Sequence, residues 1–61
     1  MAQSPRLRVV CVHALNGRPM FVRLGEDKFL LSKKPVVAII RGDQYEVRES
    51  RKEIEQFIRD A

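Results

Sequence analysis

The chain has 61 residues, and its 12 Lys and Arg residues against 8 Asp and Glu residues give a net charge of +4. This length predicts one small domain, whose core is marginal unless tight packing or self-association supports it. One Cys excludes an internal disulfide, and one His with one Cys is too few for a usual zinc site, so we expect no metal and no cofactor.

The composition, 44% hydrophobic and 33% charged, indicates a folded chain rather than an intrinsically disordered one. No apolar run approaches the roughly 18 residues that a membrane helix needs, which predicts no membrane insertion. Residues 1–5 lack a charged segment followed by an apolar one, so we expect no signal peptide and a cytoplasmic protein. We expect residues 1–5 to be disordered and residues 6–61 to form one β-rich domain.

The first predicted hairpin starts with alternating apolar and polar residues from Arg6 to Leu15. Asn16-Gly17 follows and is typical of a two-residue type I′ turn, which would place Cys11 opposite Val22. That register predicts a core face made of Leu7, Val9, Cys11, Met20, Val22 and Leu24. The outward face would then contain Arg8, Val10, Val12, Phe21 and Arg23.

A second hairpin is predicted further along the chain. It is preceded by a turn, a short strand and a basic loop at residues 25–27, 28–31 and 32–35. Gly42-Asp43, between strands at residues 36–41 and 44–48, is typical of a type II′ turn and would place Ile40 opposite Tyr45. The residues expected to share one face are Val36, Ala38, Ile40, Tyr45 and Val47.

The last segment predicts a helix over residues 50–60, because Ser50 and Glu53 have the spacing of a capping box. A helix this short does not persist alone in water, so its apolar stripe should dock on the sheet. The stripe contains Ile54, Phe57, Ile58 and Ala61. Phe57 is its largest side chain, and its truncation is expected to be the most damaging change in the helix. The predicted fold class is α+β, mainly β: about five short antiparallel strands in two hairpins, a small SH3-like or open-barrel sheet, and one C-terminal helix.

The positive charge is concentrated in residues 1–41, which hold eight basic residues against two acidic ones, a net charge of +6. Basic and aromatic side chains on a sheet can contact the backbone and the bases of a nucleic acid. The candidates for binding nucleic acid or another partner are Arg8, Arg18, Phe21, Arg23, Lys28, Lys33, Lys34 and Arg41. In the first helical turn, Arg51 and Lys52 either reach an anion or an acidic partner or are screened by neighbouring glutamates.

The outward face of the first hairpin leaves three alternatives open. It can bind nucleic acid, it can form a subunit interface, in which Arg and aromatic residues are enriched, or it can be partly buried in a small barrel. Because a sheet this small leaves an edge open and no covalent staple supports the core, we expect a homodimer. The predicted dimer interface contains Val10, Val12 and Phe21.

No catalytic residue is predicted. Cys11 and His13 lie two apart on one strand, the spacing of a nucleophile and its base, but both belong to the predicted core face. A reactive thiolate needs exposure, so Cys11 is expected to be structural. The glycines are isolated turn residues and form no phosphate-binding loop, and we expect that the protein is not an enzyme.

Several short segments resemble one known family. They are Leu15-Asn16-Gly17-Arg18-Pro19, the apolar run at residues 36–40, Gly42, and Tyr45-Glu46-Val47-Arg48-Glu49-Ser50 followed by Glu53-Ile54. Over residues 9–58 this pattern resembles the small FlbD/SwrD-type proteins of flagellar and swarming motility, which have an LNG turn, a proline-led central strand and a V-x-E-S segment opening the last helix. The resemblance implies an accessory role without catalytic residues.

We therefore predict a small, basic, non-catalytic regulatory or accessory protein that binds nucleic acid through its sheet. Two alternatives stay open. One is a protein-interaction adaptor of the motility type, which the resemblance implies. The other is a phage- or plasmid-encoded inhibitor of a host protein, which the length of the chain permits.

Overall fold

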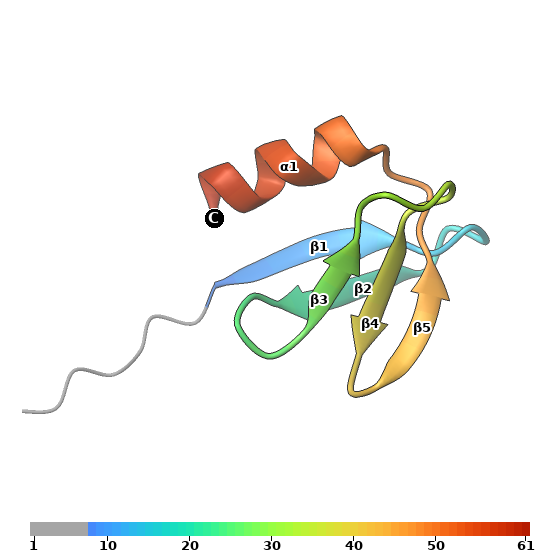
Figure 1. The fold of residues 1–61 in the computed structure, drawn as a ribbon, viewed down its shortest axis with the longest axis horizontal. Coiled ribbons are helices and arrows are strands. Elements are labelled where there is room, and N and C mark those ends of the chain that lie inside the picture. The colour runs from blue at the N-terminus through green and yellow to red at the C-terminus, as the bar shows by residue number, and fades with distance from the viewer. Residues whose placement is uncertain (1–7) are drawn as a thin grey trace, which may run out of the picture.

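The computed structural model describes residues 8–61, which form five strands and one helix (Figure 1). In chain order these are β1 (Val9–His13), β2 (Pro19–Arg23), β3 (Lys28–Leu30), β4 (Val37–Ile40), β5 (Asp43–Glu46) and α1 (Arg51–Asp60). The named strands pair antiparallel, which confirms the predicted mainly-β fold with a C-terminal helix. The expected disorder of residues 1–5 lies outside the described residues.

The strands form two sheets, one of β1 and β2 and one in the order β3-β4-β5. The sheets meet where β1 enters its hairpin loop. There, Ala14 pairs with Val47, and the Arg48 amide donates to the His13 carbonyl oxygen at 2.9 Å. Within residues 8–61 the two sheets are therefore joined without closing into a barrel.

The first hairpin has a three-residue loop instead of the predicted two-residue turn. The Ala14 amide donates to the Arg18 carbonyl oxygen at 2.8 Å, and the Gly17 amide donates to the Ala14 carbonyl oxygen at 2.9 Å. Only Gly17 in this loop has a positive φ, +91°, as expected for a type I turn followed by a glycine bulge. The side-chain oxygen of Asn16 accepts a hydrogen bond from the Arg18 amide at 3.0 Å, which stabilises this loop.

The additional loop residue shifts the register by one and reverses the two faces of β1. Phe21 pairs with Cys11. Val10 and Val12 are 3% and 0% exposed and belong to the core, whereas Val9 and Cys11 are exposed. The prediction that Val10 and Val12 form a dimer interface is therefore wrong, because both side chains are buried inside the monomer. The predicted core positions of Val9, Cys11 and His13 are also wrong, because the shifted register puts these side chains on the outward face of β1.

The second hairpin keeps its predicted faces although its turn differs. Arg41 and Gly42 both have a positive φ, +54° and +84°, which makes this a type I′ turn one residue earlier than predicted. Ala38 therefore pairs with Tyr45 instead of Val47, a shift of two residues. Since side chains alternate with a period of two, this shift leaves each one on its face. Ala38 and Val47 are buried as predicted, while Tyr45 is 40% exposed.

Both sheets and α1 contribute to a single core. Its buried members are Val10, Val12, Val22, Val36, Ala38, Val47 and Ile54. The helix packs against β1, and Figure 1 shows it lying over this strand. Ser50 is its N-cap and forms the predicted capping box with Glu53. Ile54 is fully buried and Phe57 is 37% exposed, so Ile54 rather than Phe57 anchors the helix.

Candidate binding groove

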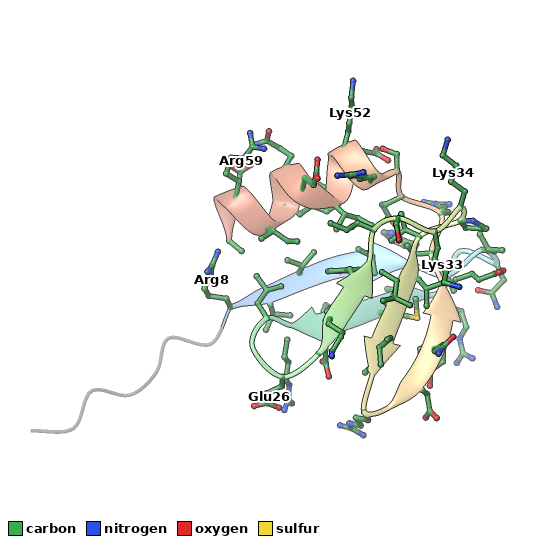
Figure 2. The ribbon with its side chains drawn as sticks, viewed as in Figure 1. Arg8, Glu26, Lys33, Lys34, Lys52 and Arg59 are labelled. Carbon is green, nitrogen blue, oxygen red and sulfur yellow. The ribbon has the colours of Figure 1, made fainter. Side chains whose placement is uncertain are left out.

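A groove of about 520 Å³ lies between the β3–β4 loop and the segment that leads from β5 into α1. Figure 2 shows the Lys33 and Lys34 side chains on this loop. The groove has five apolar lining residues, which we call the floor: Leu15, Leu31, Pro35, Val36 and Val47. It also has four basic lining residues, which we call the rim: Lys33, Lys34, Arg48 and Arg51. The lining thus combines apolar surface with positive charge.

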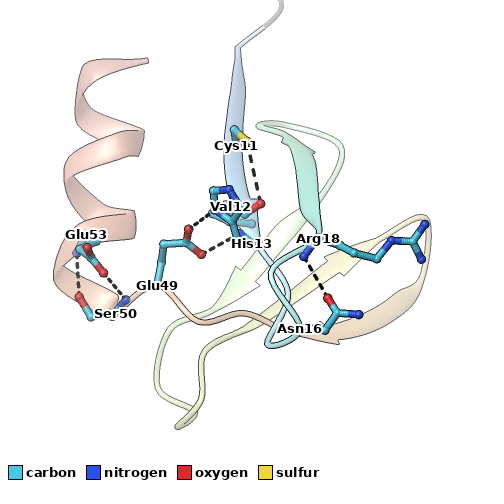
Figure 3. Close-up of polar contacts among 8 residues, drawn as sticks. All are labelled: Cys11, Val12, His13, Asn16, Arg18, Glu49, Ser50 and Glu53. Carbon is cyan, nitrogen blue, oxygen red and sulfur yellow. Dashed lines mark hydrogen bonds and ion pairs between the residues drawn. The ribbon is translucent and has the colours of Figure 1, made fainter.

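Hydrogen bonds hold the segments on both sides of the groove in place. The Val47 amide donates to the Val36 carbonyl oxygen at 2.9 Å, which joins two floor residues, one before β4 and one after β5. On the helix side, the Glu53 amide donates to the Ser50 hydroxyl at 3.2 Å and the Ser50 amide donates to the Glu53 carboxylate at 2.8 Å (Figure 3). The start of α1 is therefore fixed beside the groove by its own capping box.

Glu49 is the one carboxylate in the groove lining, and it is bound to His13. One Glu49 oxygen accepts from the His13 amide at 2.8 Å, and the other lies 2.6 Å from His13 Nδ1 (Figure 3). Burial raises the pKa of Glu49, but hydrogen bonds from the His13 ring and amide outweigh it and hold the pKa below the ordinary value. Glu49 is therefore ionised near neutral pH and is engaged within the molecule.

The cations of the rim differ in what they contact. Lys33, Lys34 and Arg48 form no ion pair with any residue that the structure describes. The Arg51 guanidinium lies 3.1 Å from the Glu55 carboxylate, but both side chains are more than a third exposed, so this pair contributes little. The groove consequently presents positive charge that is not neutralised within residues 8–61.

A second hollow, of about 470 Å³, lies between β2 and the β4–β5 turn. It contains two aromatic side chains, Phe21 and Tyr45, and two guanidinium groups, Arg23 and Arg41. Three carboxylates line it as well, those of Glu26, Asp27 and Asp43. With one more acid than base, the lining of this hollow has no excess of positive charge, unlike the lining of the groove.

The eight residues predicted to bind a partner do not form one surface in the structure. Lys33 and Lys34 line the groove, and Phe21, Arg23 and Arg41 line the second hollow. Arg18 and Lys28 are exposed but line neither, and the guanidinium of Arg8 donates to the Ile58 carbonyl oxygen at 2.8 Å, near the end of α1. Of the four basic residues in the groove lining, the predicted set therefore contained two, Lys33 and Lys34.

The sequence prediction missed Arg48 as part of this rim and left the role of Arg51 open. Both lie in the polar segment around Ser50, the N-cap of α1, and the capping-box spacing carries no information on which distant loop lies beside it.

Cys11 and His13 share the outward face of β1, but they contact different groups. The Cys11 thiol lies 3.9 Å from the Val12 carbonyl oxygen, and the His13 ring is bound to Glu49. Residues 8–61 contain no group of three His, Cys, Asp or Glu side chains placed to hold a metal ion. In the same part of the chain, no helix has the length and apolar character needed to cross a membrane.

No family model, curated protein or solved structure matches this chain. The resemblance to FlbD/SwrD-type proteins therefore stays a prediction. The groove remains the main candidate site, with an apolar floor and with three cations, Lys33, Lys34 and Arg48, that form no ion pair within residues 8–61.

Proposed function

We propose that this protein is a cytoplasmic, non-catalytic binding module whose groove takes an acidic, partly apolar segment of a partner protein. One observation carries the proposal. The apolar floor is bordered by Lys33, Lys34 and Arg48, none of which is paired with a described residue. The carboxylate of Glu49 in the same lining is bound to His13 and forms no ion pair with these cations, and four basic residues against this one acid leave the lining with an excess of positive charge.

The chemistry of the floor favours a peptide. Its side chains are those of Leu, Pro and Val, which pack well against aliphatic side chains of a partner. Proteins that bind single-stranded nucleic acid generally stack the bases on aromatic rings, and this floor has no aromatic ring. Carboxylates of the partner would meet the rim cations, which gives orientation and a faster association.

Nucleic acid is the second candidate ligand, because the same unpaired cations can contact phosphate groups. The net charge of +4 supports this alternative. The resemblance to FlbD/SwrD-type proteins supports the first candidate, an adaptor that binds another protein. The two ligands differ in how strongly salt weakens their binding, and this difference separates them experimentally.

The test uses two probes and the full chain. Fluorescence anisotropy measures binding of a labelled synthetic peptide of alternating Leu and Glu residues, and of single-stranded and duplex oligonucleotides, at 50 and 200 mM salt. We expect the peptide to bind and the double variant Lys33→Glu with Lys34→Glu to weaken its binding about tenfold or more. Replacing the exposed floor residue Leu15 by Ser should also weaken it.

The matched control is the double variant Lys28→Glu with Lys52→Glu, which makes the same charge change at exposed positions outside the groove. We expect this variant to bind the peptide nearly as tightly as the wild type. An equal loss in both double variants would show attraction by net charge alone and would refute the groove as the site. Tighter binding of an oligonucleotide, with a steep dependence on salt, would instead assign the groove to nucleic acid.

A further inference from the structure

We infer that a second copy of this chain occupies the hollow between β2 and the β4–β5 turn, forming a symmetric dimer that is independent of the groove. Phe21 lines this hollow and is 63% exposed, the highest value among the large hydrophobic side chains of residues 8–61. Tyr45, on β5, is 40% exposed in the same hollow, beside the partly buried Met20 and Ile40. Covering these rings would remove considerable apolar surface from water.

The position of Phe21 suits a reciprocal contact. Its pairing with Cys11 puts its side chain on the face of the hairpin opposite to the core residues Val10 and Val12. The hollow of about 470 Å³ has room for one aromatic ring. About a twofold axis, Phe21 of each copy fills the hollow of the other, which is the self-complementary arrangement of an isologous interface.

The charged groups of the hollow also complement one another. The Arg23 guanidinium lies 3.9 Å from the Glu26 carboxylate, and Asp27 accepts hydrogen bonds from the Arg23 and Arg41 amides at 2.9 and 3.4 Å. The side chains of Arg41 and Asp43, one on each side of the turn glycine, have no partner among the residues that the structure describes. A twofold axis brings Arg41 of each copy to Asp43 of the other.

Two further observations favour a second copy over another occupant. The hollow holds three carboxylates against two guanidinium groups, so a phosphate backbone is not attracted to it, whereas a surface carrying both signs is able to place opposite charges together across a twofold axis. The core of the monomer is small and contains no disulfide, since the chain has a single Cys. Association is one of the usual ways in which a domain of this size gains stability.

Sedimentation equilibrium of the full chain at about 100 μM tests this inference, and we expect twice the monomer mass. Phe21→Glu should weaken the dimer about 30-fold or more, since it places a charge at the centre of the interface. Phe57→Glu is the matched control, because Phe57 is an exposed aromatic residue on α1 outside the hollow, and this variant should remain dimeric. A monomeric wild type at this concentration would overturn the inference.

A charge exchange tests the arrangement of the interface. Arg41→Asp alone and Asp43→Arg alone should each weaken the dimer about tenfold, because each places like charges together twice. The double variant should recover most of the lost affinity, with circular dichroism confirming the fold in each case. Failure of the double variant to recover would refute the pairing of Arg41 with Asp43. The groove variants at Lys33 and Lys34 should leave the mass unchanged, so the dimer and the proposed function can fail separately.

Discussion

His13 and Glu49 are 36 residues apart in the chain, and two hydrogen bonds of 2.8 and 2.6 Å join them. The pair connects the end of β1 to the residue before the N-cap of α1. A third hydrogen bond, from the Arg48 amide to the His13 carbonyl oxygen, strengthens this junction between β1 and the segment before α1. This junction fixes the wall of the groove that carries Arg48 and Arg51.

The first prediction concerns the pH dependence of this junction. Because the pKa of Glu49 in the folded state is lowered by its hydrogen bonds to His13, Glu49 stabilises the fold above the ordinary glutamate pKa of about 4.3. This contribution should be lost as the pH falls through that value towards the folded-state pKa. Glu49→Gln should cost about 1–3 kcal/mol at neutral pH and much less in acid. Urea denaturation of both proteins at several pH values measures this, and parallel profiles would contradict it.

The second prediction separates two residues of the helix. Ile54 is 0% exposed, so Ile54→Ala should leave a cavity and cost about 2–5 kcal/mol. Phe57 is 37% exposed and is not among the residues packed against the core, so Phe57→Ala should cost clearly less. Thermal denaturation followed by circular dichroism compares the two variants. The reverse order would mean that α1 docks through a different face.

The third prediction concerns the N-cap of α1. Ser50→Ala removes the acceptor for the Glu53 amide and should cost about 1 kcal/mol. Ser50→Asp keeps an acceptor at this position and should retain most of the stability. Urea denaturation with the helical signal as the probe distinguishes these outcomes. Equal stability of the alanine variant and the wild type would show that the capping box contributes nothing in solution.

The fourth prediction concerns the β4–β5 turn. Gly42 has a φ of +84°, and a Cβ built there would meet no atom within 4 Å. Any cost of Gly42→Ala therefore comes from the backbone conformation alone, and we expect about 1 kcal/mol. Ser32→Ala, in an exposed loop, is the control and should change the free energy of unfolding by less than about 0.5 kcal/mol. A neutral Gly42→Ala would indicate a different turn in solution.

The sequence by itself determined the number, order and type of the elements. The β-rich runs, the turn glycines and the spacing of Ser50 and Glu53 are local signals, and local signals decide where strands and helices begin and end. The face of the second hairpin was also predictable, because its register differs from the expected one by an even number of residues.

Tertiary structure decided which face of β1 is buried. Asn16-Gly17 is compatible with a two-residue or a three-residue loop, and the two loops give opposite faces. In the folded protein, the three-residue loop directs Val10 and Val12 into the core, while Phe21 on β2 keeps its predicted outward position. One additional loop residue therefore determined whether Val10 and Val12 lie on the outward face or in the core. No local sequence pattern distinguished the two loop lengths.

The groove likewise exists only in the folded molecule. Lys33 and Lys34 are far in sequence from Arg48, and the pairing of Val36 with Val47 brings the two segments together. The position of Glu49 in the groove lining also depends on His13, which lies on β1 and binds this carboxylate. Charge along the chain was visible from the sequence, but the effect of each charge depends on distances that long-range strand pairing sets.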